Sequence, residues 1–352
     1  MTVYSCGRCR KEFVSTGRYN RHMARKLPCT KNEAEEPVAA DARVEEPVAV
    51  TTRPFIKWVG GKTQIIGSVM RLFPRVMNNY FEPFLGGGSV LLALLDYRDS
   101  GYIRIAGGIY ASDLNSNIIG LYKNVQADPD GLVAEVGKIV GEFSRCADGE
   151  RNRKAATLDE ALASPESYYF WVRAKFNALS REGRTSLVAS AMLIFMNKTC
   201  FRGVYREGPS GFNVPFGNYK NPTVVIEGHI REVSRKIRDV VFACTPFDEV
   251  VAAANAGDFV YLDPPYAPVD CKSFVSYTKD GFDIKQHTKL FGLCRGLKEK
   301  NVKMVMSNAD VELVLDAFPP SDYVVGVINC RRAINSKKPG KCVDEVLITN
   351  RE

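Results

Sequence analysis

The sequence predicts an α/β fold with a sheet of mixed strand direction, preceded by a small separate unit. Short apolar runs alternate with helical patterns on both sides of a mostly helical middle block. A glycine loop directly follows one predicted strand, and the last two predicted strands form a closing hairpin pair. The 352 residues exceed the roughly 100 to 200 of one domain, so one large domain with an appendage is expected.

Composition and charge indicate a globular protein with an anionic partner. Hydrophobic residues make up 45% and charged residues 25%, which excludes a disordered or fibrous chain. The net charge of +8 is divided unevenly: residues 1–30 hold seven Lys or Arg against one acid, and residues 31–52 hold two against six. Neither a membrane span nor a signal-peptide run is visible, so we expect a soluble, intracellular protein with mostly free cysteines.

Residues 1–30 are predicted to form a zinc finger. The spacing C-x2-C-x12-H-x6-C provides three thiolates and an imidazole, which suit tetrahedral Zn²⁺. The predicted metal ligands are Cys6, Cys9, His22 and Cys29. Tyr4, Phe13 and Tyr19 occupy the core positions of a ββα finger whose helix begins near Ser15 or Thr16, so the segment resembles a C2H2-type finger ending in Cys. The alternative is a disordered tail with stray cysteines.

The finger and the segment after it suggest a tethered accessory unit. Arg18, Arg21 and Arg25 favour DNA contact, while a protein partner is the alternative, since fingers bind both. Residues 31–52 repeat Glu-Glu-Pro-Val-Ala and contain no aromatic residue. They are predicted to be a flexible acidic linker.

The first predicted strands carry a nucleoside-binding pattern. Residues 80–84 form a strand that enters the loop 86–88, and Ser89 is expected to cap the following helix. Residues 103–111 form the next strand, interrupted by Gly107 and Gly108, and lead to Asp113, an acid that can hold ribose hydroxyls. The glycine spacing differs from G-x-G-x-x-G and no Walker lysine follows, which favours an adenosyl cofactor without a pyrophosphate.

The middle of the chain is predicted to be an insertion. Residues 122–240 are mostly helical, with a polar stretch rich in Gly and Pro at 199–222. The main domain therefore comprises residues 53–121 and 241–352. Its later strands are expected at 259–262, 302–306, 323–328 and 343–349.

The most specific motif is Asp263-Pro264-Pro265-Tyr266, which follows the apolar strand 259–262. Methylation of an exocyclic amine needs acceptors beside its N–H groups, and the Asp263 carboxylate and Pro264 carbonyl can supply them. The ring of Tyr266 can stack on a base extruded from a duplex. The motif predicts amine methylation of a base, with Asp263, Pro264 and Tyr266 as catalytic residues.

Together these residues resemble the Dam-type (alpha-class) adenine-N6 DNA methyltransferases over positions 53–350. The resemblance includes Phe55-Ile-Lys-Trp-Val-Gly-Gly-Lys62, Ala111-Ser-Asp-Leu-Asn115, Phe212-Asn-Val-Pro-Phe-Gly217, Met306-Ser-Asn308 and Arg331-Arg332, in the family's order. It implies a Rossmann-like sheet that binds S-adenosylmethionine and an inserted helical target-recognition domain. The cofactor-binding residues expected on this basis and from the glycine loop are Trp58, Lys62, Glu82, Phe84, Gly86, Gly88, Asp113 and Asp263.

The resemblance also implies double-stranded DNA as the partner. The stretch 197–206 resembles the family's DNA-reading loop, where Arg206 can address guanine. GATC is the first expected site, although the family's GATC enzymes carry different residues around positions 199–208. The residues expected to contact DNA are Arg206, Asn213, Pro215, Arg331, Arg332, Lys337 and Lys338.

Other functions compete with this interpretation. The chain could be a catalytically idle DNA- or protein-binding module, or a methyltransferase for RNA or cytosine N4. The intact Asp263, Tyr266 and Lys62 argue against an idle module. Transfer to cytosine C5 would need a Pro-Cys nucleophile, which does not follow the apolar strands identified here. We expect a monomer.

Overall fold

The structure, a computed structural model, describes residues 4–6, 12–13, 16–23, 49–224, 227–268, 282–331 and 342–351. The chain divides into two compact units, 1–47 and 48–352, and each is described by itself.

The N-terminal unit has the order strand, strand, helix. Its elements are β1 (Tyr4–Ser5), β2 (Glu12–Phe13) and α1 (Thr16–Met23), with β1 and β2 antiparallel. The predicted helix start is confirmed, and the Tyr4 and Tyr19 rings stack with their centroids 5.6 Å apart. Cys6 and His22 are buried, whereas Cys9 and Cys29 lie outside the described residues. Within the described residues no group of three or more His, Cys, Asp or Glu could hold a metal ion, so zinc binding stays a prediction.

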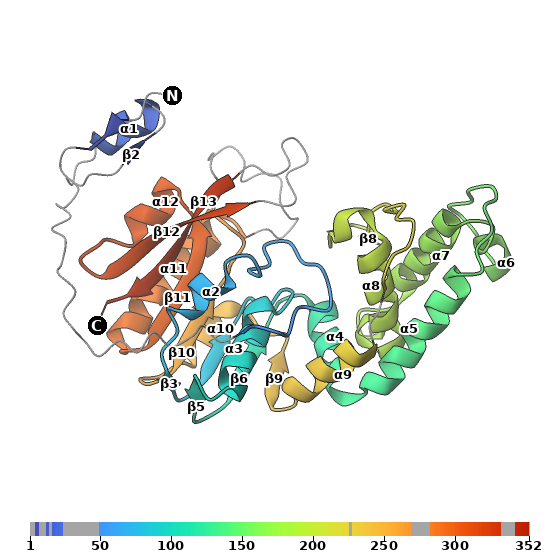
Figure 1. Cartoon of the computed structure of the whole chain (residues 1–352), viewed down its shortest axis with the longest axis horizontal. Coiled ribbons are helices and arrows are strands. Elements are labelled where there is room, and N and C mark those ends of the chain that lie inside the picture. The colour runs from blue at the N-terminus through green and yellow to red at the C-terminus, as the bar shows by residue number, and fades with distance from the viewer. Residues whose placement is uncertain are drawn as a thin grey trace. The chain divides into compact units, whose positions relative to one another are not determined.

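Seven strands form the central sheet of the larger unit, in the order β12-β13-β11-β10-β4-β6-β9 (Figure 1). The strands are β4 (Tyr80–Glu82), β6 (Ile109–Ser112), β9 (Val240–Ala243), β10 (Phe259–Leu262), β11 (Lys303–Ala309), β12 (Tyr323–Arg331) and β13 (Cys342–Asn350). Neighbouring strands are parallel from β9 to β11, and β13 runs antiparallel to both of its neighbours. The mixed α/β sheet and the closing antiparallel pair are therefore confirmed.

Helices cover both faces of this sheet because its central strands are apolar on both sides. In β10, Phe259 and Tyr261 belong to one buried cluster, while Val260 and Leu262 belong to the other, as the two-residue period of a strand requires. The first face packs against α2 (Ile66–Met70), α3 (Ser89–Asp99) and α4 (Ser116–Ala127). The second packs against α10 (Phe247–Ala252), α11 (Ile284–Glu299) and α12 (Glu312–Ala317).

Between β6 and β9 the chain is mostly helical, as predicted (Figure 1). The elements after α4 are α5 (Pro129–Phe143), α6 (Leu158–Ala161), α7 (Pro165–Ala178), η1 (Gly183–Thr185), α8 (Leu187–Thr199), η2 (Phe201–Gly203), the hairpin β7 (Glu207–Gly208) and β8 (Gly211–Phe212), and α9 (Glu227–Lys236). Asp128 and Ser186 cap α5 and α8 through their side chains. In the described ranges, no helix is both long and apolar enough to cross a membrane.

Two local predictions need correction. The predicted interruption at Gly107 and Gly108 is confirmed, but it divides residues 103–111 into two strands of different sheets: β5 (Arg104–Ile105) pairs with β3 (Val76–Met77) in a separate ribbon, and only β6 joins the main sheet. The break lies at Gly107 and Gly108, whose N–H groups bond the Asn78 carbonyl and the Asn79 side chain instead of continuing one ladder. Ser89 is the first residue of α3 and does not cap it. The cap is Gly88, with φ of 68°, and makes no side-chain bond.

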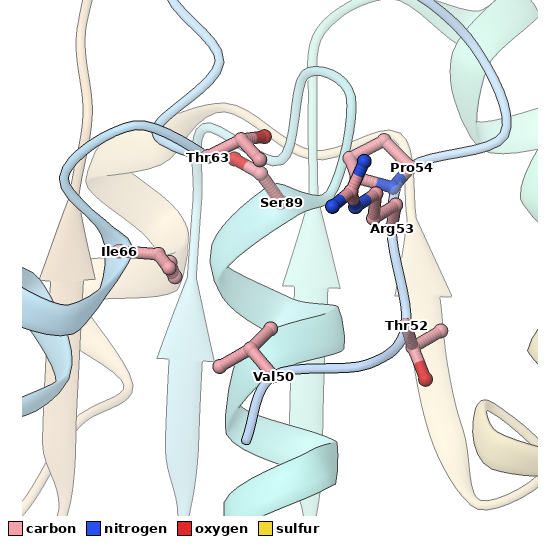
Figure 2. A pocket seen from close by; sticks show the side chains of 7 residues that line it. All are labelled: Val50, Thr52, Arg53, Pro54, Thr63, Ile66 and Ser89. Atoms are coloured by element: carbon pink, nitrogen blue, oxygen red, sulfur yellow. The ribbon is translucent and has the colours of Figure 1, made fainter. Parts of the chain in front are cut away.

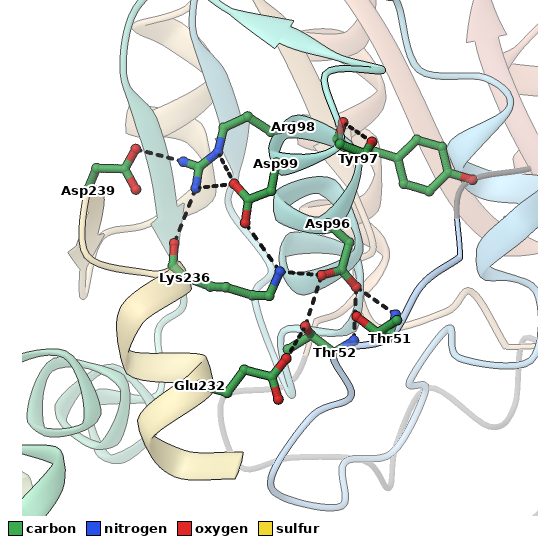
Figure 3. A network of polar contacts seen from close by, with 10 residues as sticks. Thr51, Thr52, Asp96, Tyr97, Arg98, Asp99, Glu232, Lys236 and Asp239 are labelled. Carbon is green, nitrogen blue, oxygen red and sulfur yellow. Dashed lines mark hydrogen bonds and ion pairs between the residues drawn. The ribbon is translucent and has the colours of Figure 1, made fainter. Parts of the chain in front are cut away.

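A polar network fastens the first residues of this unit to its helices (Figure 3). Asp96 of α3 accepts hydrogen bonds from the backbone N–H groups of Thr51 and Thr52, each at 2.9 Å. Its other oxygen pairs with Lys236 Nζ at 2.6 Å, which connects α3 to α9. Arg98 extends the network to Asp239, just before β9. The Asp96 and Lys236 side chains are only 4% and 13% exposed, and Lys236 Nζ also pairs with Asp99 at 3.2 Å.

Candidate active site

Three acids gather at one edge of the sheet. Glu82 ends β4, Asp263 directly follows β10, and Asp113 directly follows β6. These strands are parallel neighbours, so their carboxyl ends lie at the same edge of the sheet, the usual binding position in such sheets. The glycine loop and the Asp-Pro-Pro-Tyr motif, about 175 positions apart along the chain, therefore lie at one edge of the sheet.

Lys62 supplies the positive charge at this edge. Its Nζ lies 2.7 Å from Asp263 Oδ2 and 2.6 Å from the Gly60 carbonyl oxygen. Its backbone N–H donates to Ser89 Oγ at 3.0 Å, which gives Ser89 a role other than the predicted cap. Because the Lys62 side chain is 4% exposed, this pairing is shielded from water.

The acid cluster favours a cationic ligand. Burial, together with the nearby Asp263 and Asp113 carboxylates, raises the pKa of Glu82 to about 8, although the bond donated by the Tyr80 hydroxyl opposes the rise. Burial also raises the pKa of Asp263, which Lys62 opposes. The pKa of Asp113 is likewise raised by burial, although the N–H groups of Asn115 and Gly86 donate to it. One buried and two half-buried carboxyls with one close ammonium group leave room for a further positive charge.

The glycine loop is packed under aromatic rings. Gly86 and Gly88 have φ angles of 48° and 68°, a region that glycine adopts without strain. A Cβ added at Gly87 would lie 2.7 Å from the Cβ of Trp58, and one added at Gly86 would lie 2.8 Å from its indole nitrogen. Asp113 accepts the Gly86 N–H at 2.9 Å. Trp58, the loop and Asp113 are thus brought together.

The Asp-Pro-Pro-Tyr segment continues from β10 across the same edge. Pro264 is buried and Tyr266 is half-buried. The Tyr266 hydroxyl donates to Glu345 Oε2 at 2.8 Å, and Lys62 Nζ lies 5.0 Å from the ring centroid. Burial raises the pKa of Tyr266, and Asp263 and Glu345 raise it further, so the phenol stays protonated and can donate.

Phe84, a predicted cofactor-binding residue, packs against the second face of the sheet, which α10, α11 and α12 cover. Its ring stacks on that of Phe247 at 5.4 Å and meets Phe282 edge-on at 5.7 Å. It therefore belongs to the aromatic cluster at the start of α10, beside the strand that ends in Glu82.

The predicted DNA-reading residues meet around the hairpin β7–β8. Arg206 Nε donates to Asn213 Oδ1 at 2.7 Å, and the Asn213 N–H donates to the Arg206 carbonyl at 3.1 Å. The Pro215 carbonyl accepts the Phe201 N–H at 2.8 Å. Arg331 ends β12, its side chain lies outside the described residues, and so do Arg332, Lys337 and Lys338.

Several contacts at the site could not be predicted from the sequence. The Asn197 side chain both accepts the Lys57 N–H and donates to the Lys57 carbonyl, each at 2.8 Å, which ties α8 to the segment that carries Trp58. Trp58 also lies 5.1 Å from the ring of Tyr205. Glu345 had no sequence signal except its place in the closing strand.

A small pocket of about 130 Å³ lies next to the Lys62 segment (Figure 2). It is lined by Val50, Thr52, Arg53, Pro54, Thr63, Ile66 and Ser89. None of the three acids lines it, so it is separate from the acid cluster.

Comparisons with known proteins agree with this geometry. Residues 58–325 match the family model of the D12 class N6 adenine-specific DNA methyltransferases. The chain is 35% identical to the type II methyltransferase M.MjaIII of Methanocaldococcus jannaschii over 308 residues, which cover 85% of this chain and 99% of that protein. It is 28% identical to the type II methyltransferase M1.LlaDCHI of Lactococcus lactis, over 86% of this chain and 96% of that protein. It is 29% identical to the DNA adenine methylase of Escherichia coli K12, over 84% of this chain and 94% of that protein.

Proposed function

Because the chain belongs to the D12 class of N6 adenine-specific, S-adenosylmethionine-dependent DNA methyltransferases, we propose that the edge formed by Glu82, Asp113 and Asp263 is its methyl-transfer site. The observation that supports this most strongly is the convergence of the glycine loop, Lys62 and the Asp-Pro-Pro-Tyr segment at the ends of three adjacent parallel strands. Double-stranded DNA is the proposed substrate.

The residues at this edge fit the cofactor's charges. S-adenosylmethionine supplies an activated methyl group on a positively charged sulfur, and its amino group adds a second positive charge. The buried carboxyls would favour these charges, and Asp113 would accept bonds from ribose hydroxyls. Lys62 can pair with the cofactor's carboxylate. The proposed cofactor-binding residues are Trp58, Lys62, Glu82, Phe84, Gly86, Gly88, Asp113 and Asp263.

Asp263, Pro264 and Tyr266 are the proposed catalytic residues. Asp263 and the Pro264 carbonyl accept hydrogen bonds from the N–H groups of the extruded adenine's amine. These bonds direct the nitrogen lone pair at the methyl group. Tyr266 stacks on the extruded ring. Asp263 need not be a strong base, because the amine becomes acidic once it is methylated. Positioning, rather than proton abstraction, supplies most of the effect.

The helical block 122–240 is proposed to recognise the target within a catalytic domain formed by 53–121 and 241–352. Arg206, held by Asn213, supports this role because its guanidinium is exposed and can address guanine O6 and N7. Arg331, Arg332, Lys337 and Lys338 are proposed to contact phosphates. GATC is the first recognition sequence to test.

Residues 1–30 are proposed to bind structural Zn²⁺ through Cys6, Cys9, His22 and Cys29. The strand, strand, helix order and the burial of both Cys6 and His22 in so small a unit support this. We propose that the unit anchors a monomeric enzyme near DNA, with recruitment of a protein partner as the alternative.

The deciding experiment is transfer of labelled methyl groups to unmethylated duplex DNA, followed by mapping of N6-methyladenine. The intact chain should modify adenine at a defined sequence, and Asp263→Ala should not. Cofactor binding without transfer to any DNA would refute the proposal and favour RNA as substrate or an idle binding module.

A further inference from the structure

Glu345 connects the closing strand to the proposed catalytic segment. It lies on β13, outside the Asp-Pro-Pro-Tyr motif and the glycine loop. Its Oε2 accepts the Tyr266 hydroxyl at 2.8 Å, across a separation of 79 positions in the chain. The contact exists only because β13 is paired in the sheet.

A second bond from the neighbouring strand fixes the same segment. Asn308 of β11 is fully buried, and its Oδ1 accepts the Ala267 N–H at 3.0 Å. The ladder between β11 and β13 pairs Ala309 with Glu345 and Asn308 with Val346, so the two acceptors come from adjacent rungs. One holds the backbone directly after Tyr266, and the other holds the end of its ring.

The two ends of this arrangement carry opposite charges. Lys62 Nζ lies 5.0 Å from the centroid of the Tyr266 ring, and the Glu345 carboxylate accepts a hydrogen bond from the phenol. A phenol in this half-buried position without an acceptor would lose a charge-assisted hydrogen bond and gain rotational freedom. A ring that must receive an extruded base benefits from being fixed before the base arrives.

We propose that Glu345 is a positioning residue that fixes the orientation of the Tyr266 ring for the extruded adenine. It acts through the Tyr266 hydroxyl and does not contact the reacting atoms. This inference rests on the proposed role of Tyr266 in stacking.

The test is a double-mutant cycle. Glu345→Leu removes the acceptor at similar size, and Tyr266→Phe removes the donor but keeps the ring. Each should lower kcat on the order of tenfold, and the double variant should be no slower than either single variant. Glu345→Gln keeps an acceptor and should restore most of the rate. Asp344→Asn, whose side chain bonds Asn329 on β12, is the matched control and should retain the full rate.

A second readout separates positioning from general stability. With 2-aminopurine at the target position, Glu345→Leu and Tyr266→Phe should both change the fluorescence of the extruded base while cofactor affinity stays unchanged. Should Glu345→Leu fail to fold, Tyr266→Phe and Glu345→Gln still measure the bond. A wild-type rate in Tyr266→Phe, or losses that multiply in the double variant, would overturn the inference. Unimpaired transfer by Tyr266→Ala would instead overturn the proposed role of Tyr266 itself.

Discussion

Cofactor binding should release a proton from Glu82, and Glu82→Gln should abolish that release. Glu82 ends β4 in a buried position beside Asp263 and Asp113, and its pKa is raised to about 8 by burial and by these two acids. It is therefore mostly neutral at pH 7. A positively charged ligand at the same edge would favour the carboxylate form and drive the proton off.

The size of the release follows from these values. One unit below its pKa, Glu82 is protonated in about nine molecules of ten. An opposite charge within about 4–6 Å lowers a carboxyl pKa by about 1 to 3 units, and a decrease of about two units would reverse that proportion. About 0.8 proton should then leave per cofactor bound at pH 7. At pH 9, where the free protein is mostly ionised, the release should fall to about 0.1 proton.

Calorimetry measures this directly. Titration of the whole chain with S-adenosylmethionine in buffers of different ionisation enthalpy gives the proton number from the slope of the observed heat. S-adenosylhomocysteine, whose sulfur is neutral, should release fewer protons and serves as the matched ligand control. The reasoning is refuted by the absence of release at pH 7, or by a release that Glu82→Gln leaves unchanged.

The stability of the free protein should also depend on the protonation of Glu82. Because the folded pKa of Glu82 lies above its ordinary 4.5, the folded state holds the extra proton between these values, and stability should fall as pH rises from about 4.5 to about 8. Glu82→Gln should remove this part of the pH dependence. Urea unfolding across that range measures it.

Three further predictions concern other parts of the chain. Asp96→Asn should lower the free energy of unfolding by roughly 1 to 3 kcal/mol at pH 7, because Lys236 would lose its 2.6 Å ion pair and keep only the longer one with Asp99 at 3.2 Å. Burial opposes a low pKa for Asp96, but the bonds from Lys236 and Thr52 hold this pKa below its ordinary value. The difference in urea stability between the wild type and Asp96→Asn should therefore shrink as pH falls below about 4. An equal difference at pH 3 would contradict this. Arg206→Ala should reduce discrimination at one base pair by about 1 to 3 kcal/mol, measured as kcat/KM on duplexes with single substitutions, whereas a uniform loss on all duplexes would assign Arg206 to the backbone. The purified chain should contain bound zinc that Cys9→Ser removes, as elemental analysis would detect; metal content unaffected by the substitution would exclude the predicted ligand set.

Six of the seven strands in the main sheet were predicted because each is a short apolar run between turn residues, whereas β9 (Val240–Ala243) was not predicted. β10 is buried on both faces, so its sequence is apolar throughout, and the acid that follows it marks the carboxyl end of a parallel strand. This placed Asp263 at the carboxyl edge of the parallel strands from sequence alone. Asp113 followed from the same logic, although the strand before it is shorter than predicted.

Contacts between distant segments were not predictable in the same way. Ser89 has the sequence of a helix cap, yet its hydroxyl accepts the Lys62 N–H, because the segment from Trp58 to Lys62 folds back over the glycine loop. Glu345 joins Tyr266 only through the register of β11 and β13. Periodicity identifies which face of a strand is buried, but register decides which side chains meet.

The position of β13 in the sheet matters during synthesis of the chain. This strand follows every other strand of the sheet along the chain, yet it lies between β11 and β12. A nascent chain that has reached β12 therefore has an open place in its sheet and no Glu345 beside Tyr266. Shortened products that end before residue 342 would lack both this strand and the carboxylate that bonds the Tyr266 hydroxyl, so we expect no activity until translation has passed β13.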